Sequence, residues 1–142
     1  MILGFIGTGK ISSSVITGIC NSKIKYKKIL ISSRNSVISN RLKKKFKKIF
    51  IIKKNQEIID KSDWVFLAIT PKVGEKIIKD LKFKTNQTVI SFISTINLPT
   101  LKKMIKVKST IVRAIPLPPI SLKKGPVPIC PPNKKVKNFF DK

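Results

Sequence analysis

The fold depends most on the segment Ile2-Leu-Gly-Phe-Ile-Gly-Thr-Gly-Lys-Ile-Ser12, at the start of the chain. Ile2 to Ile6 is an apolar run of the length of a buried strand, and a helical pattern begins directly after Gly7-Thr-Gly9. A strand, a glycine turn and a helix N-terminus together attract an anion, because the first helical turn has free N–H groups and lies at the positive end of the helix dipole. Gly7 permits the sharp turn, Gly9 leaves room for a pyrophosphate, and Ser12 takes the third small position. This order of elements favours a dinucleotide-binding turn over an ordinary strand-to-helix turn.

Beyond this segment, short apolar runs alternate with apolar stripes at helical spacing. The pattern predicts further strands at residues 26–31, 49–52, 64–69, 88–93 and 110–115, and helices at 11–21, 36–48, 56–61, 73–81 and 98–105. Ser36 is the expected cap of the second helix, whose buried stripe would be Val37, Ile38, Leu42 and Phe46. Alternation with short loops predicts an α/β, Rossmann-like, doubly wound parallel sheet with strand order 3-2-1-4-5-6. Its ligand would lie across the carboxyl ends of the first and fourth strands.

The last part of the chain departs from this alternation. Residues 116–132 are rich in proline, which excludes a regular helix there, but residues 127–130 could add a short edge strand. Residues 134–140 carry an apolar face that includes Phe139 and Phe140 and that needs a partner. We therefore expect residues 1–132 to form a nucleotide-binding domain. Residues 133–142 would begin a helix that either leads to a helical C-terminal domain absent from this chain or packs against a partner.

Composition narrows the function classes. A chain of 142 residues with 42% hydrophobic residues suits a single domain with one core, and no apolar run reaches the ~20 residues of a membrane span. No signal peptide is expected, and the two distant cysteines suit a reducing, cytoplasmic location better than a disulfide. The chain has no His, and no metal site is expected.

The formal net charge of +25 raises the alternative of a nucleic-acid or anionic-membrane surface. However, lysines occur along the whole chain, and aromatic residues do not alternate with them as they do in single-strand binding surfaces. The densest run, residues 41–48, is typical of a solvated helix face. Compositional bias therefore explains the charge better, and we expect neither a specific nucleic acid nor a membrane as a partner.

Three segments together resemble pyrroline-5-carboxylate reductases. Gly4-Phe-Ile-Gly-Thr-Gly-Lys-Ile-Ser12 is similar to the opening of that family, and Ser62-Asp-Trp-Val-Phe-Leu-Ala-Ile-Thr-Pro71 to its Ser/Ala-Asp, apolar strand, Ala-Val-Lys-Pro segment. Val112-Arg-Ala-Ile-Pro116 aligns with the family's Val-Arg-Val-Met-Pro. The likeness covers nearly the whole chain as the family's N-terminal domain. It implies an NAD(P)H-dependent oxidoreductase of proline biosynthesis that transfers a hydride to a cyclic imine, with a helical C-terminal domain that dimerises and completes the substrate site.

The resemblance also implies a set of cofactor-binding residues. They are Ile6, Gly7, Thr8, Gly9, Lys10 and Ile11 around the pyrophosphate, Ser32, Ser33 and Arg34 at the adenosine ribose and its 2′-phosphate, Asn55, and Ala68, Ile69 and Thr70 along the cofactor. The residues themselves agree at Ser33-Arg34, because NAD sites usually place an acid here and a guanidinium suits a phosphate instead. NADP is therefore the expected cofactor, with NAD as an alternative. A solvated loop arginine at Arg34, a helix cap at Asn55 and a strand-end residue at Thr70 remain open alternatives.

Departures from the family leave the substrate open. Thr70 replaces a Lys, Ile93-Ser94-Thr95 replaces a small Ala-Ala-Gly segment, and Leu117-Pro118 replaces the Asn-Thr of Pro-Asn-Thr-Pro. Two interpretations fit: a relative that reduces another imine or an oxo compound, and a truncated or divergent NAD(P)-binding protein without catalysis. A basic nucleic-acid-binding protein is the third, less favoured interpretation. No catalytic residue is assigned, because Glu57, Asp60, Glu75 and Asp80 all fall on predicted helices as solvated charges.

Overall fold

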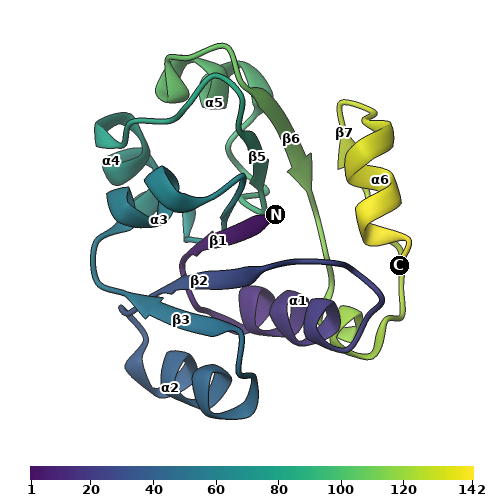
Figure 1. The fold of residues 1–142 in the computed structure, drawn as a ribbon. Helices are drawn as coiled ribbons and strands as arrows, with labels where there is room; N and C mark the ends of the chain where they lie inside the picture. Colours follow the sequence, from purple (N-terminus) through teal and green to yellow (C-terminus); the bar gives the residue numbers. More distant parts are fainter.

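The computed structural model describes all 142 residues and contains one seven-stranded sheet (Figure 1). The strand order is β3-β2-β1-β4-β5-β6-β7, in which the first six strands are parallel and β7 runs antiparallel to β6. The strands are β1 (Ile2–Ile6), β2 (Lys28–Ser32), β3 (Ile49–Ile52), β4 (Trp64–Leu67), β5 (Thr88–Ser91), β6 (Thr110–Ala114) and β7 (Ile129–Cys130). The predicted fold class and strand order are confirmed, and the extra edge strand occupies the second half of the predicted segment.

Six α-helices connect and flank the strands. They are α1 (Lys10–Cys20), α2 (Ser36–Lys45), α3 (Asn55–Lys61), α4 (Pro71–Ile77), α5 (Leu98–Ile105) and α6 (Lys134–Phe140). The helix predicted at 73–81 begins earlier, at Pro71, because the fixed φ of proline suits the first helical position. It then tightens into a 3₁₀ turn, η1 (Ile78–Asp80). None of these helices combines the length and the hydropathy that crossing a membrane requires.

Strand side chains alternate between two hydrophobic layers, one on each face of the sheet. In β4, Trp64 and Phe66 belong to one layer, and Val65 and Leu67 belong to the other. Buried side chains of α1, α2 and α6 complete the first layer, and those of α3, η1 and α5 complete the second (Figure 1). All four β4 residues are buried, as expected for a parallel strand at the centre of a sheet that is covered on both faces.

The second helix, α2, differs from its predicted pattern. Its cap is Asn35, whose Oδ1 accepts a hydrogen bond from the N–H of Ile38 at 3.2 Å, and not Ser36. Val37 was predicted to be buried but is 76% exposed, whereas Ser39 is completely buried. The helix is therefore rotated so that a hydroxyl, and not a valine, faces the end of β2.

The proline-rich segment packs against α1 and is not an extended linker. It contains a 3₁₀ turn, η2 (Pro118–Leu122), which the sequence did not predict, and no α-helix, as expected. A Cβ on Gly18 of α1 would stand 2.5 Å from the carbonyl oxygen of Ile120, so the glycine is needed for this close approach. Because η2 and α1 pack this closely, the segment belongs to the same globular unit as the sheet.

The final helix, α6, covers its own apolar face by returning to the sheet. The ring of Phe139 lies 4.8 Å from that of Trp64 and 5.9 Å from that of Phe66, measured between centroids. Val136 and Phe139 are both buried, and Phe140 is partly buried with its ring edge-on to Phe139. The expectation that this face is left uncovered is therefore wrong for Val136 and Phe139.

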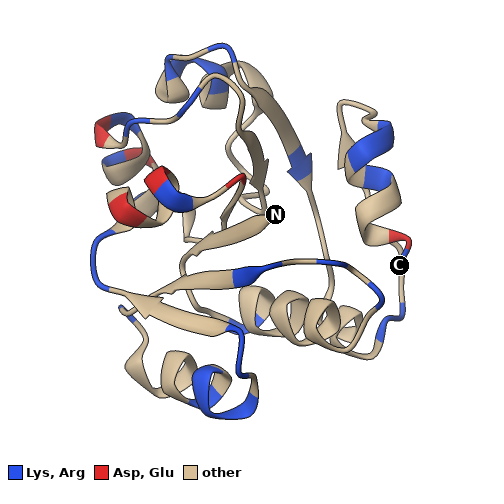
Figure 2. Ribbon diagram, viewed as in Figure 1, with Lys and Arg blue, Asp and Glu red and all other residues tan.

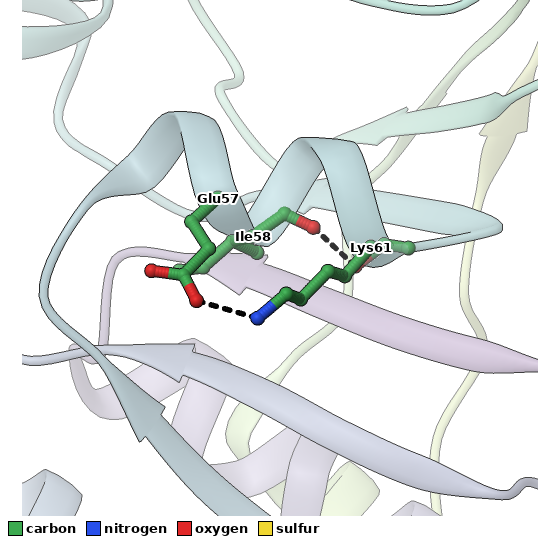
Figure 3. Close-up of polar contacts among 4 residues, drawn as sticks. Glu57, Ile58 and Lys61 are labelled. Carbon is green, nitrogen blue, oxygen red and sulfur yellow. Dashed lines mark hydrogen bonds and ion pairs between the residues drawn. The ribbon is translucent and has the colours of Figure 1, made fainter.

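Close packing of α3 on β1 explains why residue 4 of the chain is a glycine. A Cβ on Gly4 would stand 2.2 Å from the hydroxyl oxygen of Ser62, which donates a hydrogen bond to the carbonyl of Ile58 at 2.6 Å. On the outer side of α3, Lys61 pairs with Glu57 at 2.6 Å (Figure 3). The inner contacts place α3 against β1, and the outer pair is a solvated contact of low energy.

Candidate functional site

The site begins with the turn at the carboxyl end of β1. Gly7 has a φ of 98°, in the left-handed region where residues with a side chain are strained. A Cβ at this position would also stand 2.2 Å from the carbonyl oxygen of Ala68, just after β4. The turn therefore lies where β1 meets β4, which is the point where the strand order reverses and where doubly wound sheets bind their ligands.

Gly9 serves a different purpose from Gly7. It precedes α1 in an extended conformation (φ −84°, ψ −168°) that any residue can adopt, and a Cβ there would have no atom within 4 Å. The open side of Gly9 is thus free space beside the first turn of α1. The N–H groups of that turn have no partner within the helix, and no acidic residue lies in it. This arrangement suits a phosphate that approaches the backbone.

A buried cluster of hydroxyl groups supports the turn from behind. The N–H of Gly7 donates a hydrogen bond to Oγ of Ser32 at 2.9 Å, and Oγ1 of Thr8 donates to the carbonyl of Ser32 at 3.3 Å. Oγ of Ser39 lies 2.9 Å from the same carbonyl and 3.2 Å from Oγ1 of Thr8. The side chains of Thr8, Ser32 and Ser39 are all buried. They hold the glycine turn against the end of β2 and the first turn of α2. Two of them, Thr8 and Ser32, are predicted site residues whose hydroxyl groups stabilise the turn.

Three adjoining hollows run along the carboxyl edge of the sheet, with volumes of about 470, 130 and 350 Å³. The first lies over the glycine turn, between Arg34 and Thr70. The smaller second hollow shares Arg34 with it and extends to Asn55 and the end of β3. The third shares Thr70 with the first and extends to Pro116 after β6. Every predicted site residue except Lys10 lines at least one of these hollows, so the structure brings the predicted set together.

For Arg34, Asn55 and Thr70 the sequence left open a role other than cofactor binding, and the contacts of each side chain bear on that choice. Asn55 is the first residue of α3, and the residue in the cap position is Lys54, so the side chain of Asn55 does not cap the helix. Thr70 occupies the cap position of α4, but its hydroxyl makes no capping hydrogen bond. Arg34 is exposed and takes part in neither of the two salt bridges of the structure. All three side chains are therefore available to a ligand in the hollows.

Sequence reasoning missed several residues of the site. The second hollow includes Lys53, and the third is lined mainly by apolar residues, of which Phe92 and Ile115 were not predicted. Lys53 directly follows β3, so the rule that ligands meet strand ends could have found it. Phe92 and Ile115 follow β5 and β6 in the same way.

The electrostatic character of the site is positive. No Asp or Glu lines any of the three hollows, whereas Arg34 and Lys53 do. Most acidic residues lie on α3, α4 and η1 (Figure 2), and none of them lines a hollow. An anionic ligand is therefore favoured in the two hollows that Arg34 lines.

Titratable groups with a shifted pKa lie outside the hollows. Burial raises the pKa of the Tyr26 hydroxyl, and its hydrogen bond to Cys20 at 3.3 Å acts in the same direction. Burial also raises the pKa of the Cys20 thiol. Both residues lie near the C-terminal end of α1, so neither is placed to transfer a proton at the glycine turn. The third hollow itself contains no ionisable side chain.

Comparison with known proteins gives consistent results. Residues 2–95 match the model of a family described as NADP oxidoreductase, coenzyme F420-dependent. The chain is 26% identical over 126 residues to pyrroline-5-carboxylate reductase 3 of Danio rerio, an alignment that covers 87% of this chain and 43% of that protein. The resemblance that three segments of the sequence indicated is thereby confirmed.

Solved structures show the same fold. Pyrroline carboxylate reductase of Plasmodium falciparum, with NADP bound, superposes with a TM-score of 0.82 at 22% identity, covering 99% of this chain and 54% of that one. Prephenate dehydrogenase of A. aeolicus, in complex with hydroxyphenyl propionate and NAD⁺, gives a TM-score of 0.78 at 17% identity, covering 99% and 56%. The chain thus spans about half the length of the relatives it matches.

Proposed function

This chain belongs to the family of NADP oxidoreductases described as coenzyme F420-dependent, and we propose that it is the NADP-binding part of a reductase resembling pyrroline-5-carboxylate reductase. The reaction proposed is hydride transfer to a small cyclic imine, as the enzyme of that name in Danio rerio suggests. One observation carries the proposal: an open glycine turn at the β1–β4 junction adjoins hollows that contain Arg34 and no carboxylate.

The proposal assigns one part of the cofactor to each hollow. The pyrophosphate lies against Gly9 and the first turn of α1, where free N–H groups and the helix dipole favour an anion. The adenosine ribose and its 2′-phosphate lie beside Ser33 and Arg34. The absence of an acid at this position removes the group that holds the ribose hydroxyls in NAD sites, which supports NADP over NAD.

The nicotinamide ring is assigned to the third hollow. Ile69, Phe92 and Ile115 supply an apolar surface on which a flat ring can pack and from which water is excluded. When bound, the cofactor supplies the hydride. The residues of this chain bind and orient it, and the proposal gives none of them the role of catalytic acid or base.

The rest of the assembly is also part of the proposal. The relatives are about twice as long as this chain, so we propose that the substrate site and any homo-oligomer contacts of the reductase need residues beyond these 142. Residues 1–132 would form the nucleotide-binding domain, with α6 packed on it as the link to a helical C-terminal domain. A divergent NADP-binding protein without catalysis is the second candidate, favoured by the lack of ionisable groups in the third hollow.

Titration of the purified chain with NADPH, measured by calorimetry, tests the binding function. Gly9→Ala is the sharpest variant, because its new methyl group meets no protein atom but fills the space that the pyrophosphate needs. We expect it to keep the thermal stability of the wild type and to weaken NADPH binding by about tenfold or more, which is ~1.4 kcal/mol or more. Unchanged affinity in a folded Gly9→Ala protein would refute the assigned pyrophosphate position.

A separate assay distinguishes the two candidate functions. The absorbance of NADPH is monitored with pyrroline-5-carboxylate and with larger cyclic imines, using the chain together with any residues that follow it in the natural protein. Consumption of NADPH supports the reductase, and binding without turnover of any imine supports the non-catalytic candidate.

A further inference from the structure

Lys53 is the charged residue of the site that neither the sequence pattern nor the resemblance indicated. It follows β3 directly and lines the 130 Å³ hollow together with Ser33, Arg34 and Asn55. We infer that Lys53 is a specificity-determining residue that, together with Arg34, binds the 2′-phosphate of NADP from the opposite side of this hollow. The inference rests on the proposed function and adds a second cation to it.

The hollow brings two cations from separate strand ends to one small space. Arg34 follows β2, Lys53 follows β3, and these two strands are neighbours in the sheet. Ile69, Val73 and Ile77 form its apolar side. A ligand group held here is thus contacted by polar side chains from two strand ends and is bounded by aliphatic side chains from the segment around α4.

Neither cation is neutralised within the protein. Lys53 and Arg34 make no salt bridge and no side-chain hydrogen bond. The acids nearest in sequence have other partners: Glu57 pairs with Lys61 at 2.6 Å (Figure 3), and Asp60 accepts a hydrogen bond from Gln56 at 2.8 Å. Two like charges at one hollow repel each other, and an anion between them removes that repulsion.

The chemistry of a phosphate monoester matches this pair. At neutral pH such a group carries a charge close to −2, with three acceptor oxygens. The planar guanidinium of Arg34 can contact two of these oxygens, and the ammonium of Lys53 acts as a point charge on the third. The side chains of Ser33 and Asn55 make no hydrogen bond within the protein and can donate to the same oxygens. NADH lacks the 2′-phosphate, so Lys53 should discriminate between the two cofactors.

Lys53→Ala tests the inference, with Lys54→Ala as a matched control. Lys54 is the next residue, is also exposed and carries the same charge, but it lines none of the three hollows. The affinities of NADPH, NADH, 2′-AMP and 5′-AMP are measured for the wild type and both variants at about 0.15 M salt. We expect Lys53→Ala to weaken NADPH and 2′-AMP by about two- to fivefold, as for a solvated charge pair, and to leave NADH and 5′-AMP unchanged. Lys54→Ala should change none of the four.

Each other outcome has a definite meaning. Equal losses of NADPH affinity in the two variants would show a general charge effect and would overturn the role of Lys53. Equal losses for NADPH and NADH in Lys53→Ala would place Lys53 on a part common to both cofactors, which also overturns it. Unchanged NADPH binding in Lys53→Ala would also overturn the role of Lys53, but it would leave the proposed function intact. Absence of NADPH binding in the wild type would instead refute the proposed function itself.

Discussion

The N–H of Gly7 donates a 2.9 Å hydrogen bond to Oγ of Ser32, which ties the glycine turn after β1 to the last residue of β2. Gly7 directly follows β1, Ser32 ends the adjacent parallel strand β2, and the hydroxyl that joins them is buried. A serine at the end of β2 therefore stabilises the conformation of the turn that is proposed to receive the pyrophosphate.

Ser32→Ala should lower the free energy of unfolding by about 1–3 kcal/mol, because it leaves the N–H of Gly7 without its partner. Ser33→Ala is the matched control, since the hydroxyl of Ser33 makes no hydrogen bond within the protein. Urea denaturation of both variants measures the effect. Equal stability of the two variants would show that the hydrogen bond at Gly7 contributes nothing.

Gly4→Ala should destabilise the protein by about 1–3 kcal/mol through overpacking, because its Cβ would lie 2.2 Å from Oγ of Ser62. Gly9→Ala provides the comparison, as its Cβ meets no atom within 4 Å. In thermal denaturation, the melting temperature should fall clearly for Gly4→Ala and should hardly change for Gly9→Ala. The reverse order would contradict the packing of α3 on β1.

Phe139→Ala should lower the free energy of unfolding by about 3 kcal/mol or more, because the buried ring of Phe139 packs on Trp64 and Phe66. Phe140→Ala should cost less, because that ring is only partly buried. Tryptophan fluorescence reports on the change directly, as Trp64 is the only tryptophan in the chain. If Phe139→Ala left both stability and fluorescence unchanged, α6 would not be part of the folded domain.

Alkaline pH should destabilise the protein through Tyr26 and Cys20. Burial raises the pKa of both groups above their ordinary values of 10.0 and 9.0, so the folded state retains protons that the unfolded state loses. This contribution is complete below about pH 9 and is lost as the pH rises through the raised pKa values. The free energy of unfolding should therefore fall as the pH rises above about 9, first through Cys20 and, above about pH 10, also through Tyr26. Tyr26→Phe should reduce the slope above about pH 10, and an identical slope in that variant would exclude Tyr26 as its source.

The sequence predicted the sheet well because buried parallel strands are short continuous apolar runs, such as Val65 to Leu67, and because glycine turns have few alternatives. It predicted the buried face of α2 less well. Hydrophobic spacing favoured Val37, but the buried residue is Ser39, whose hydrogen bonds to the end of β2 depend on tertiary structure. The sequence also did not predict that the apolar face of α6 packs on the sheet, because this packing depends on a contact between Phe139 and Trp64, which is distant in the sequence.

The cofactor-site prediction had a similar limit. Gly7, Gly9 and Arg34 could be proposed from the sequence because each residue type is informative at its position relative to a strand end. Lys53 could not be proposed in this way, because lysines are abundant throughout the chain and its residue type alone carries little information. Only the structure shows that it shares a hollow with Arg34.

The proposed specificity for NADP depends first on Arg34. Titration of the wild type and Arg34→Ala with NADPH and with NADH, at about physiological ionic strength, tests this dependence. A charged, bidentate contact contributes about 1.5–3 kcal/mol, so NADPH affinity should fall roughly ten- to a hundredfold in Arg34→Ala while NADH affinity stays nearly constant. Equal losses for both cofactors, or no loss for either, would contradict the role of Arg34 and the assignment of NADP with it.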